Sequence, residues 1–206
     1  MLKLQVHALG RRYGFRKVFS DLEFSAEAPQ AVVICGPNGS GKSTLLKILT
    51  YLDLPTAGQV VYSSESRKPM KKELVRSSIA FVSPEFNLYE ELSALENLKF
   101  YLKVSGRGFE SGECLECLDR VGLIKRSDDF ISEYSFGMKM RLKYALALAV
   151  KPEVLAVDEP STNLDRNGRE IAYSIMREFK RKGLLLFATN EDHETEMGDV
   201  RVELGR

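Results

Sequence analysis

A glycine-rich segment that begins at Gly36 constrains the fold of this chain more than any other feature of its sequence. It follows a short apolar run at residues 31–35 and precedes a segment with helical character at residues 44–49. A continuous apolar run that ends at a glycine is typical of a buried strand running into a turn. The order strand, glycine turn and helix predicts an α/β core built around a phosphate-binding loop.

The loop fits the pattern G-x-x-x-x-G-K-[ST]. Its glycines let backbone N–H groups wrap a phosphate chain, and the following helix adds the positive end of its dipole. We expect Lys42 to reach the β- and γ-phosphates as part of the catalytic group, and the Ser43 hydroxyl to bind Mg²⁺. A chance glycine turn would need neither the strand nor the helix. The residues predicted to contact the nucleotide are Gly36, Pro37, Asn38, Gly39, Ser40, Gly41, Lys42, Ser43 and Thr44.

Two acidic residues follow a second apolar run. Residues 154–157 are apolar and lead directly into Asp158 and Glu159. In an α/β sheet, ligands bind at the carboxyl ends of the strands. We expect Asp158 to hold Mg²⁺ through water and Glu159 to polarise the attacking water as a catalytic residue. Alternatively, the two acids form a solvated pair at a strand end.

A third signal is S-x-G before a helix, at Ser135 and Gly137. Ser135 is a good N-cap, and its hydroxyl, the Gly137 N–H and the helix N-terminus could together bind an anion. The alternative is a capped amphipathic helix with no ligand. The predicted apolar face of this helix consists of Met138, Leu142, Ala145, Leu146 and Ala149. The basic residues that lie largely off this face are Lys139, Arg141 and Lys143.

The order of these three motifs resembles the nucleotide-binding domain of ATP-binding cassette (ABC) proteins, over essentially the whole chain. The form S-x-G-M, continued as KMRLKYALAL, looks most like export-type cassettes, and SPEFNLYEELSALENLKF at residues 83–100 is similar to such exporters, including haem-exporter-like cassettes. The resemblance implies Mg-ATP as substrate with Mg²⁺ as cofactor. It also implies a head-to-tail dimer, expected to be a homodimer, in which residues 135–137 of one cassette complete the site of the other.

The resemblance also assigns single residues. Tyr13 stands where the family has an aromatic residue that stacks on adenine, with a small hairpin after it, although it could be an ordinary loop tyrosine. Residues 161–165 resemble the loop that crosses the dimer interface. The family usually has a glutamine near Pro84 and a histidine where Asn190 stands, so these two positions put the rate of turnover in doubt. His193 could replace that histidine only if its loop bends.

The remaining strands and helices are predicted from local patterns. Alternation over residues 2–8 predicts an edge strand, residues 18–24 another strand, and residues 60–62, 79–82, 184–188 and 200–204 four short strands. Residues 88–150 read mainly as helices, and residues 171–182 as one helix. We therefore expect one ABC ATP-binding domain over residues 1–206. Its fold is α/β, a P-loop NTPase core of mixed sheet and flanking helices, with an N-terminal antiparallel β subdomain and a helical subdomain inserted at about 88–150.

Composition limits the location and partners. The chain has 30 basic and 29 acidic residues, which argues against a nucleic-acid partner. No apolar run has the length of a membrane span and no secretory signal is evident, so we expect a cytoplasmic protein. The resemblance to ABC transporters implies that it is peripheral on the cytoplasmic face of the membrane. A membrane-spanning permease would then be a separate chain. Cys114 and Cys117 form a lone C-x-x-C that we interpret as helix packing with Leu118 and Val121.

Three functions fit the sequence. The first is the ATPase of an export-type ABC transporter. The second is a soluble cassette that drives a non-membrane machine, and the third is an ATP-dependent clamp with weak hydrolysis, which only Pro84 and Asn190 support.

Overall fold

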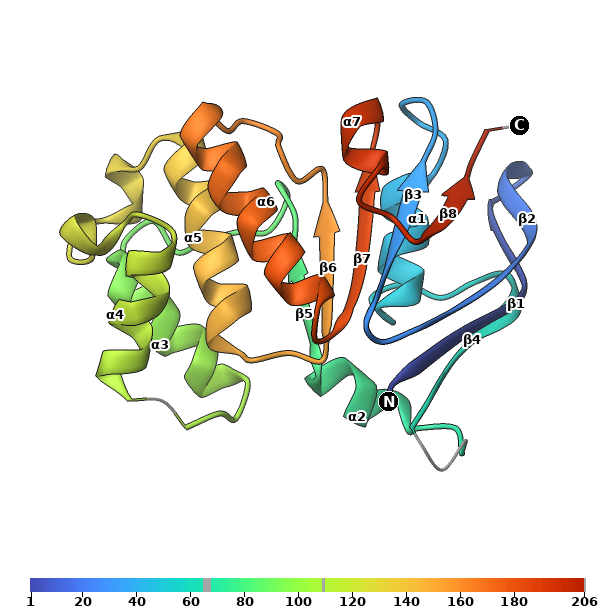
Figure 1. Ribbon diagram of the computed structural model, residues 1–206, viewed down its shortest axis with the longest axis horizontal. Coiled ribbons are helices and arrows are strands. Elements are labelled where there is room, and N and C mark those ends of the chain that lie inside the picture. Colours follow the sequence, from blue (N-terminus) through green and yellow to red (C-terminus); the bar gives the residue numbers. More distant parts are fainter. Residues whose placement is uncertain (65–67, 109, 206) are drawn as a thin grey trace. The chain divides into compact units, whose positions relative to one another are not determined.

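The computed structural model describes residues 1–64, 68–108 and 110–205 (Figure 1). Contacts divide the chain into two units. Unit 1 is assembled from Met1–Phe81, Glu153–Glu159 and Arg177–Arg206, and unit 2 from Val82–Pro152 and Pro160–Met176. Unit 1 carries the sheets, and most of the helices belong to unit 2.

The first unit contains two sheets and their short helices. Its elements are β1 (Lys3–Tyr13), β2 (Arg16–Glu27), β3 (Gln30–Cys35), α1 (Lys42–Leu49), β4 (Ala57–Ser63), α2 (Lys72–Ser77), β5 (Ile79–Val82), β6 (Val154–Asp158), β7 (Leu184–Thr189), α7 (Asp192–Thr195) and β8 (Val200–Glu203). Every strand predicted from the sequence is present, but β1 and β2 are several residues longer than expected.

The smaller sheet has three strands in the order β2-β1-β4, and both pairings are antiparallel. The predicted N-terminal antiparallel subdomain is therefore confirmed. The prediction that the first strand lies at an edge is wrong, because β1 pairs with β2 on one side and with β4 on the other. The alternation that suggested a strand reports which face is buried, and it does not reveal how many neighbours a strand has.

The larger sheet has five strands in the order β5-β6-β7-β3-β8. β3 pairs in parallel with both β7 and β8, and β6 pairs in parallel with β7. The predicted sheet was mixed, whereas these three pairings are all parallel. β3, β6 and β7 are almost wholly buried, which explains their continuous apolar sequences. This is an α/β P-loop NTPase fold.

One hydrophobic core joins the two sheets of unit 1 to helix α1. It includes Leu4 and Tyr62 from the antiparallel sheet, Leu45 from α1, and Ile34 and Leu186 from the parallel sheet. Because Val32 and Ile34 of strand β3 lie in this core and every residue from Ala31 to Cys35 is buried, the loop that follows begins from a rigid support.

The second unit is helical. Its elements are α3 (Ala94–Val104), α4 (Ser111–Arg120), α5 (Phe136–Ala149), the first part of α6 (Arg166–Lys180), and two short 3₁₀ turns at Ile124–Arg126 and Ile131–Glu133. Helices α3, α4 and α5 pack against one another (Figure 1). On α4, Cys114 and Leu118 are buried and Cys117 is half-buried, as the packing interpretation predicted. Burial raises the pKa of the Cys117 thiol to about 11.

Helix α5 differs from its prediction. Residues 142–147 are all buried, so the helix is covered on nearly every side, although the sequence predicted a single apolar face. Lys143 was placed largely off that face, and in the structure it is buried. The burial of a polar residue such as Lys143 cannot be predicted from the helix sequence alone, because the groups that bind its side chain come from elsewhere in the chain.

The loop before α3 is held by a buried amide. The side chain of Asn97 is fully buried and accepts a hydrogen bond from the Tyr89 N–H at 2.9 Å. It also donates to the carbonyls of Tyr89 at 3.0 Å and Ser93 at 2.9 Å. Ser93 and Glu96 form a capping box at the start of the helix. Across residues 1–64, 68–108 and 110–205, no helix is long and apolar enough to cross a bilayer.

Candidate functional site

The loop after β3 takes a conformation that its glycines make possible. Gly36 has φ 144°, and a Cβ there would lie 2.4 Å from the carbonyl oxygen of Leu204. Gly41 has φ 100° and directly precedes helix α1. An L-residue is strained at such φ values, and at Gly36 a side chain would also collide with backbone that cannot move aside. The loop therefore depends on glycine at both ends.

Lys42 is the first residue of α1 and its side chain is buried. Its ammonium group donates hydrogen bonds to the carbonyls of Gly36 at 2.8 Å and Pro37 at 3.2 Å. These bonds hold the cation against the loop and leave the positive charge beside the helix N-terminus. Both features favour a polyphosphate at this place.

A pocket of about 540 Å³ opens over this loop. It brings together three of the sequence predictions, since Tyr13, the loop and Glu159 all line it. Its full lining is Tyr13, Arg16, Lys17, Val18, Asn38, Gly39, Ser40, Gly41, Lys42, Ser43, Thr44, Glu159 and Gly205. All of these residues belong to unit 1. The volume and the cationic, N–H-rich floor suit a nucleoside triphosphate.

Tyr13 ends strand β1, directly before the tight turn into β2. Its ring is 52% exposed, and the Arg11 guanidinium lies 4.5 Å from the ring centroid. Arg11 also pairs with Asp53 at 3.0 Å. The Arg11 guanidinium, fixed by Asp53, thus supports the Tyr13 ring through a cation–π contact, and the supported ring is suited to stack against a flat base.

Arg16 and Lys17 were not predicted from the sequence as site residues. Both lie at the start of β2 and line the pocket beside Tyr13. The signal was available, because the two residues follow Tyr13 within four positions and are basic. Cations placed there add to the attraction for phosphate oxygens.

The two acidic residues lie at the end of β6. Asp158 is 5% exposed, and its Oδ1 atom is buried and accepts no hydrogen bond from the described residues, although the side chain has other interactions. Glu159 has φ 51°, and its backbone N–H donates to the Ala188 carbonyl of β7 at 2.9 Å. The turn at Glu159 is thereby fixed to the neighbouring strand, with the residue lining the pocket.

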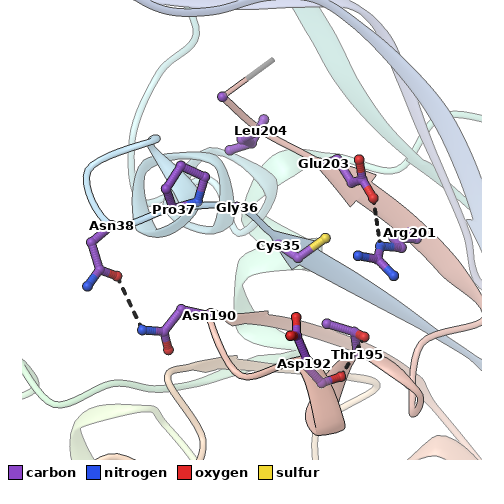
Figure 2. A pocket seen from close by; sticks show the side chains of 11 residues that line it. Cys35, Gly36, Pro37, Asn38, Asn190, Asp192, Thr195, Arg201, Glu203 and Leu204 are labelled. Carbon is purple, nitrogen blue, oxygen red and sulfur yellow. Dashed lines mark hydrogen bonds and ion pairs between the residues drawn. The ribbon is translucent and has the colours of Figure 1, made fainter.

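A second pocket, of about 480 Å³, lies beside the same loop (Figure 2). Asn190 follows β7 and lines it, and its Nδ2 atom donates to Oδ1 of Asn38 at 3.3 Å. Asn190 therefore reaches the phosphate-binding loop through a side-chain amide. His193 is exposed, with its ring 3.9 Å from Glu191, and neither pocket includes it in its lining.

The remaining predicted residues lie in unit 2. Ser135 is the N-cap of α5, and its hydroxyl oxygen accepts from the Met138 N–H at 3.2 Å. Gly137 is close to the loop at residues 161–165, since a Cβ there would lie 3.1 Å from the Asn163 carbonyl. Ser135 and Phe136 are exposed, so the helix N-terminus is open to a ligand from outside this unit.

A phosphate-binding loop on a parallel sheet, with a buried aspartate and a glutamate at the end of a nearby strand, defines the chain as a P-loop ATPase. The family model described as ABC transporter matches residues 19–162. The chain therefore belongs to the ABC transporter family as one of its ATP-binding subunits, and it is an ABC ATPase.

The relatives agree with this assignment. The glutamine transport ATP-binding protein GlnQ of Escherichia coli is 34% identical over 189 residues, which cover 89% of this chain and 79% of GlnQ. The lipoprotein-releasing system ATP-binding protein LolD of Xanthomonas oryzae is 35% identical over 188 residues, which cover 86% and 77% of the two chains. An ATP-binding cassette solved as a dimer in a post-hydrolysis state with ADP and Pi has a TM-score of 0.85 at 25% identity, covering 98% and 97%.

Proposed function

We propose that the chain is the energy-coupling ATPase of an export-type ABC transporter. Two copies would close head-to-tail on two Mg-ATP molecules at the cytoplasmic face of a membrane, and a permease on a separate chain would respond to closing and reopening. The observation that carries the proposal is the pocket that Tyr13, the phosphate-binding loop and Glu159 share.

The nucleotide would be bound by unit 1. Tyr13 would stack on the adenine, while the backbone of residues 36–44 and the Lys42 ammonium would hold the phosphates. Asn190, bonded to Asn38, would donate its amide to the γ-phosphate. Asparagine cannot become a cation, so this contact would be weaker than that of a protonated histidine.

The residues present fit a magnesium ion. The Asp158 carboxylate is buried at the end of β6, and Ser43 supplies a hydroxyl at the first turn of α1. Mg²⁺ prefers such oxygen donors. Ser43 and Asp158 would therefore hold the ion, which supplies positive charge to the phosphate oxygens when bound.

Hydrolysis would depend on positioning and charge. The Glu159 carboxylate would orient the attacking water, and Lys42 would neutralise charge that develops on the phosphates. The pocket is lined by unit 1 alone, whereas Ser135 and Gly137 belong to unit 2. We propose that these two residues serve the pocket of a second copy, where the N-terminus of α5 would bind the γ-phosphate.

Two comparisons support the dimer and the permease. The similar solved cassette is a dimer with ADP and Pi, and the names of the two relatives are those of transport and release systems. These names do not share one direction of transport. We propose export because the S-x-G-M form of the motif at residues 135–138 resembles that of export-type cassettes.

The test is phosphate release by the purified chain with Mg-ATP, measured against protein concentration beside Lys42→Ala. A composite site predicts that activity rises more than linearly with concentration and that the variant is inactive. Activity strictly proportional to concentration would refute the composite site. Tight ATP binding with no release, even with membranes that hold the permease, would favour the clamp.

A further inference from the structure

Lys143 is a buried cation that the proposed mechanism does not use. It lies near the middle of α5 and is 8% exposed. Its ammonium group donates to the carbonyl oxygens of Ser83 at 3.0 Å and Pro84 at 2.7 Å. No carboxylate among the described residues pairs with it. Burying a charge without an ion-pair partner costs free energy. A role in fixing the position of α5, which apolar packing would not provide, would explain why a lysine stands here.

The two carbonyls belong to the turn that follows β5 directly. Ser83 is nearly fully buried, and its carbonyl also accepts from the Phe86 N–H at 3.2 Å. The Ser83 hydroxyl oxygen accepts from the Glu85 N–H at 3.1 Å. The turn at residues 83–86 is thus a closed unit of hydrogen bonds, and Lys143 is the side chain that fastens it to α5.

Apolar contacts alone would leave the register of α5 loosely defined. The helix also packs against α3 and α4, and it makes two further kinds of side-chain hydrogen bond, from Arg141 to the Val121 carbonyl and from Tyr144 to the Pro160 carbonyl. Apolar packing tolerates small rotations and shifts, whereas an ammonium bound to two successive carbonyls tolerates neither without losing both bonds. Lys143 therefore helps to fix the rotation and the height of α5 against the turn at residues 83–86, which belongs to the same unit.

The N-terminus of the same helix carries the second half of the proposed composite site. Ser135 precedes Lys143 by eight positions in the sequence, about 12 Å along a helix axis. A helix of this length is stiff, so a constraint at Lys143 also constrains the direction in which Ser135 and Gly137 point.

We propose that Lys143 is a positioning residue that holds residues 135–137 in the orientation needed by the ATP of a second copy. The inference rests on the proposed function of residues 135–137 in a composite site. It assigns a specific role to a residue that touches neither the nucleotide nor Mg²⁺.

The test compares Lys143→Met with Lys139→Met. Lys139 lies one turn earlier on α5 and pairs with Glu90. We expect Lys143→Met to bind ATP within twofold of the unaltered chain, because its phosphate-binding loop is intact. Its kcat should fall about tenfold, and it should need more protein for half-maximal activity. Lys139→Met should keep kcat within twofold at pH 7.

The pH profile gives a second readout that needs no change at Lys143. Burial and the neighbouring charge of Lys139 lower the pKa of Lys143 to about 8. The amine loses its charge above that pH and donates more weakly, so kcat should fall on the alkaline side. The charged groups nearby are Lys139 and Glu90, with Glu85 in the turn. In Lys139→Met the alkaline fall should move to higher pH.

Either of two results would overturn the inference. One is a Lys143→Met protein whose kcat and concentration dependence match those of the unaltered chain. The other is an alkaline fall in kcat that persists at the same pH in Lys143→Met. If the unaltered chain shows activity proportional to concentration, the proposed composite site fails first and this inference fails with it.

Discussion

Replacing Gly41 by alanine changes the phosphate-binding loop in two separable ways. The residue has φ 100° and ψ 16°, a conformation that L-residues rarely adopt. An added Cβ would also lie 2.3 Å from Cγ1 of Val18 on β2. Gly39 provides a matched control, because it has φ 78° but nothing lies within 4 Å of a Cβ built there.

The two effects have different expected sizes. A non-glycine residue in a sparsely populated backbone region costs about 1–3 kcal/mol. Overpacking by one methyl group costs about 1–3 kcal/mol more. Gly39→Ala should therefore lower the free energy of unfolding by about 1–3 kcal/mol, and Gly41→Ala by about 2–6 kcal/mol.

The assay is urea unfolding followed by circular dichroism, since the chain has no tryptophan. Val18→Ala removes the atom that the new methyl group would meet. Val18 is half-buried, so this change alone should cost about 1 kcal/mol. In the double variant with Gly41→Ala, the loss of unfolding free energy caused by overpacking should disappear, and the loss caused by backbone strain should remain. The interaction energy of this double-mutant cycle should therefore be about 1–3 kcal/mol.

The reasoning would be refuted in either of two ways. Equal losses in Gly39→Ala and Gly41→Ala would show that contact with Val18 carries no cost. A strictly additive double variant would show the same.

Three further predictions concern other parts of the chain. Glu159→Gln should abolish single-turnover hydrolysis while ATP binding survives, and unchanged hydrolysis would remove the residue from its role. Ser93→Ala should cost about 1 kcal/mol, as for other N-caps. The backbone N–H and hydroxyl of Ser93 lower the pKa of Glu96, so this stabilisation is present above the ordinary pKa of a glutamate and is lost as pH falls through the lowered value. The free energy of unfolding should therefore fall less steeply with decreasing pH in Ser93→Ala than in the unaltered chain. Asn97→Ala should cost roughly 3 kcal/mol, because the N–H and carbonyl of Tyr89 and the carbonyl of Ser93 lose their partner, and a loss below 1 kcal/mol would contradict this.

The phosphate-binding loop could be predicted because its information is local. The motif is continuous in sequence: the strand before Gly36 is followed directly by the glycines and then by the helix from Lys42. Each of these segments supports the prediction of the one that follows it. The same holds for Asp158 and Glu159, which follow an apolar strand directly. The roles proposed for these residues remain predictions, whereas the strand and helix positions they required are confirmed.

Features that depend on distant partners could not be predicted. Strand β1 looked like an edge because its second neighbour, β4, lies some fifty residues later. Lys143 was expected largely off the apolar face because the carbonyls that bind it are about sixty residues earlier. Helix α6 was missed in part for a local reason: it begins at Arg166, where Asp165 accepts from the Gly168 N–H at 2.7 Å, whereas the apolar pattern begins only at Ile171. Capping and pairing fix these features, and neither leaves a periodic signal.

The order of strands in the parallel sheet has a consequence for synthesis of the chain. Strand β3, which supports the phosphate-binding loop, lies between β7 and β8, and both of these leave the ribosome long after it. Until residues 184–203 have emerged, β3 lacks both of its hydrogen-bonded neighbours, whereas α3, α4 and α5 are already available to one another. The nascent chain thus has a high contact order at the loop and a low one among its helices. ATP could bind only after β7 and β8 have been made, so nucleotide capture would mark the addition of these two strands to the sheet.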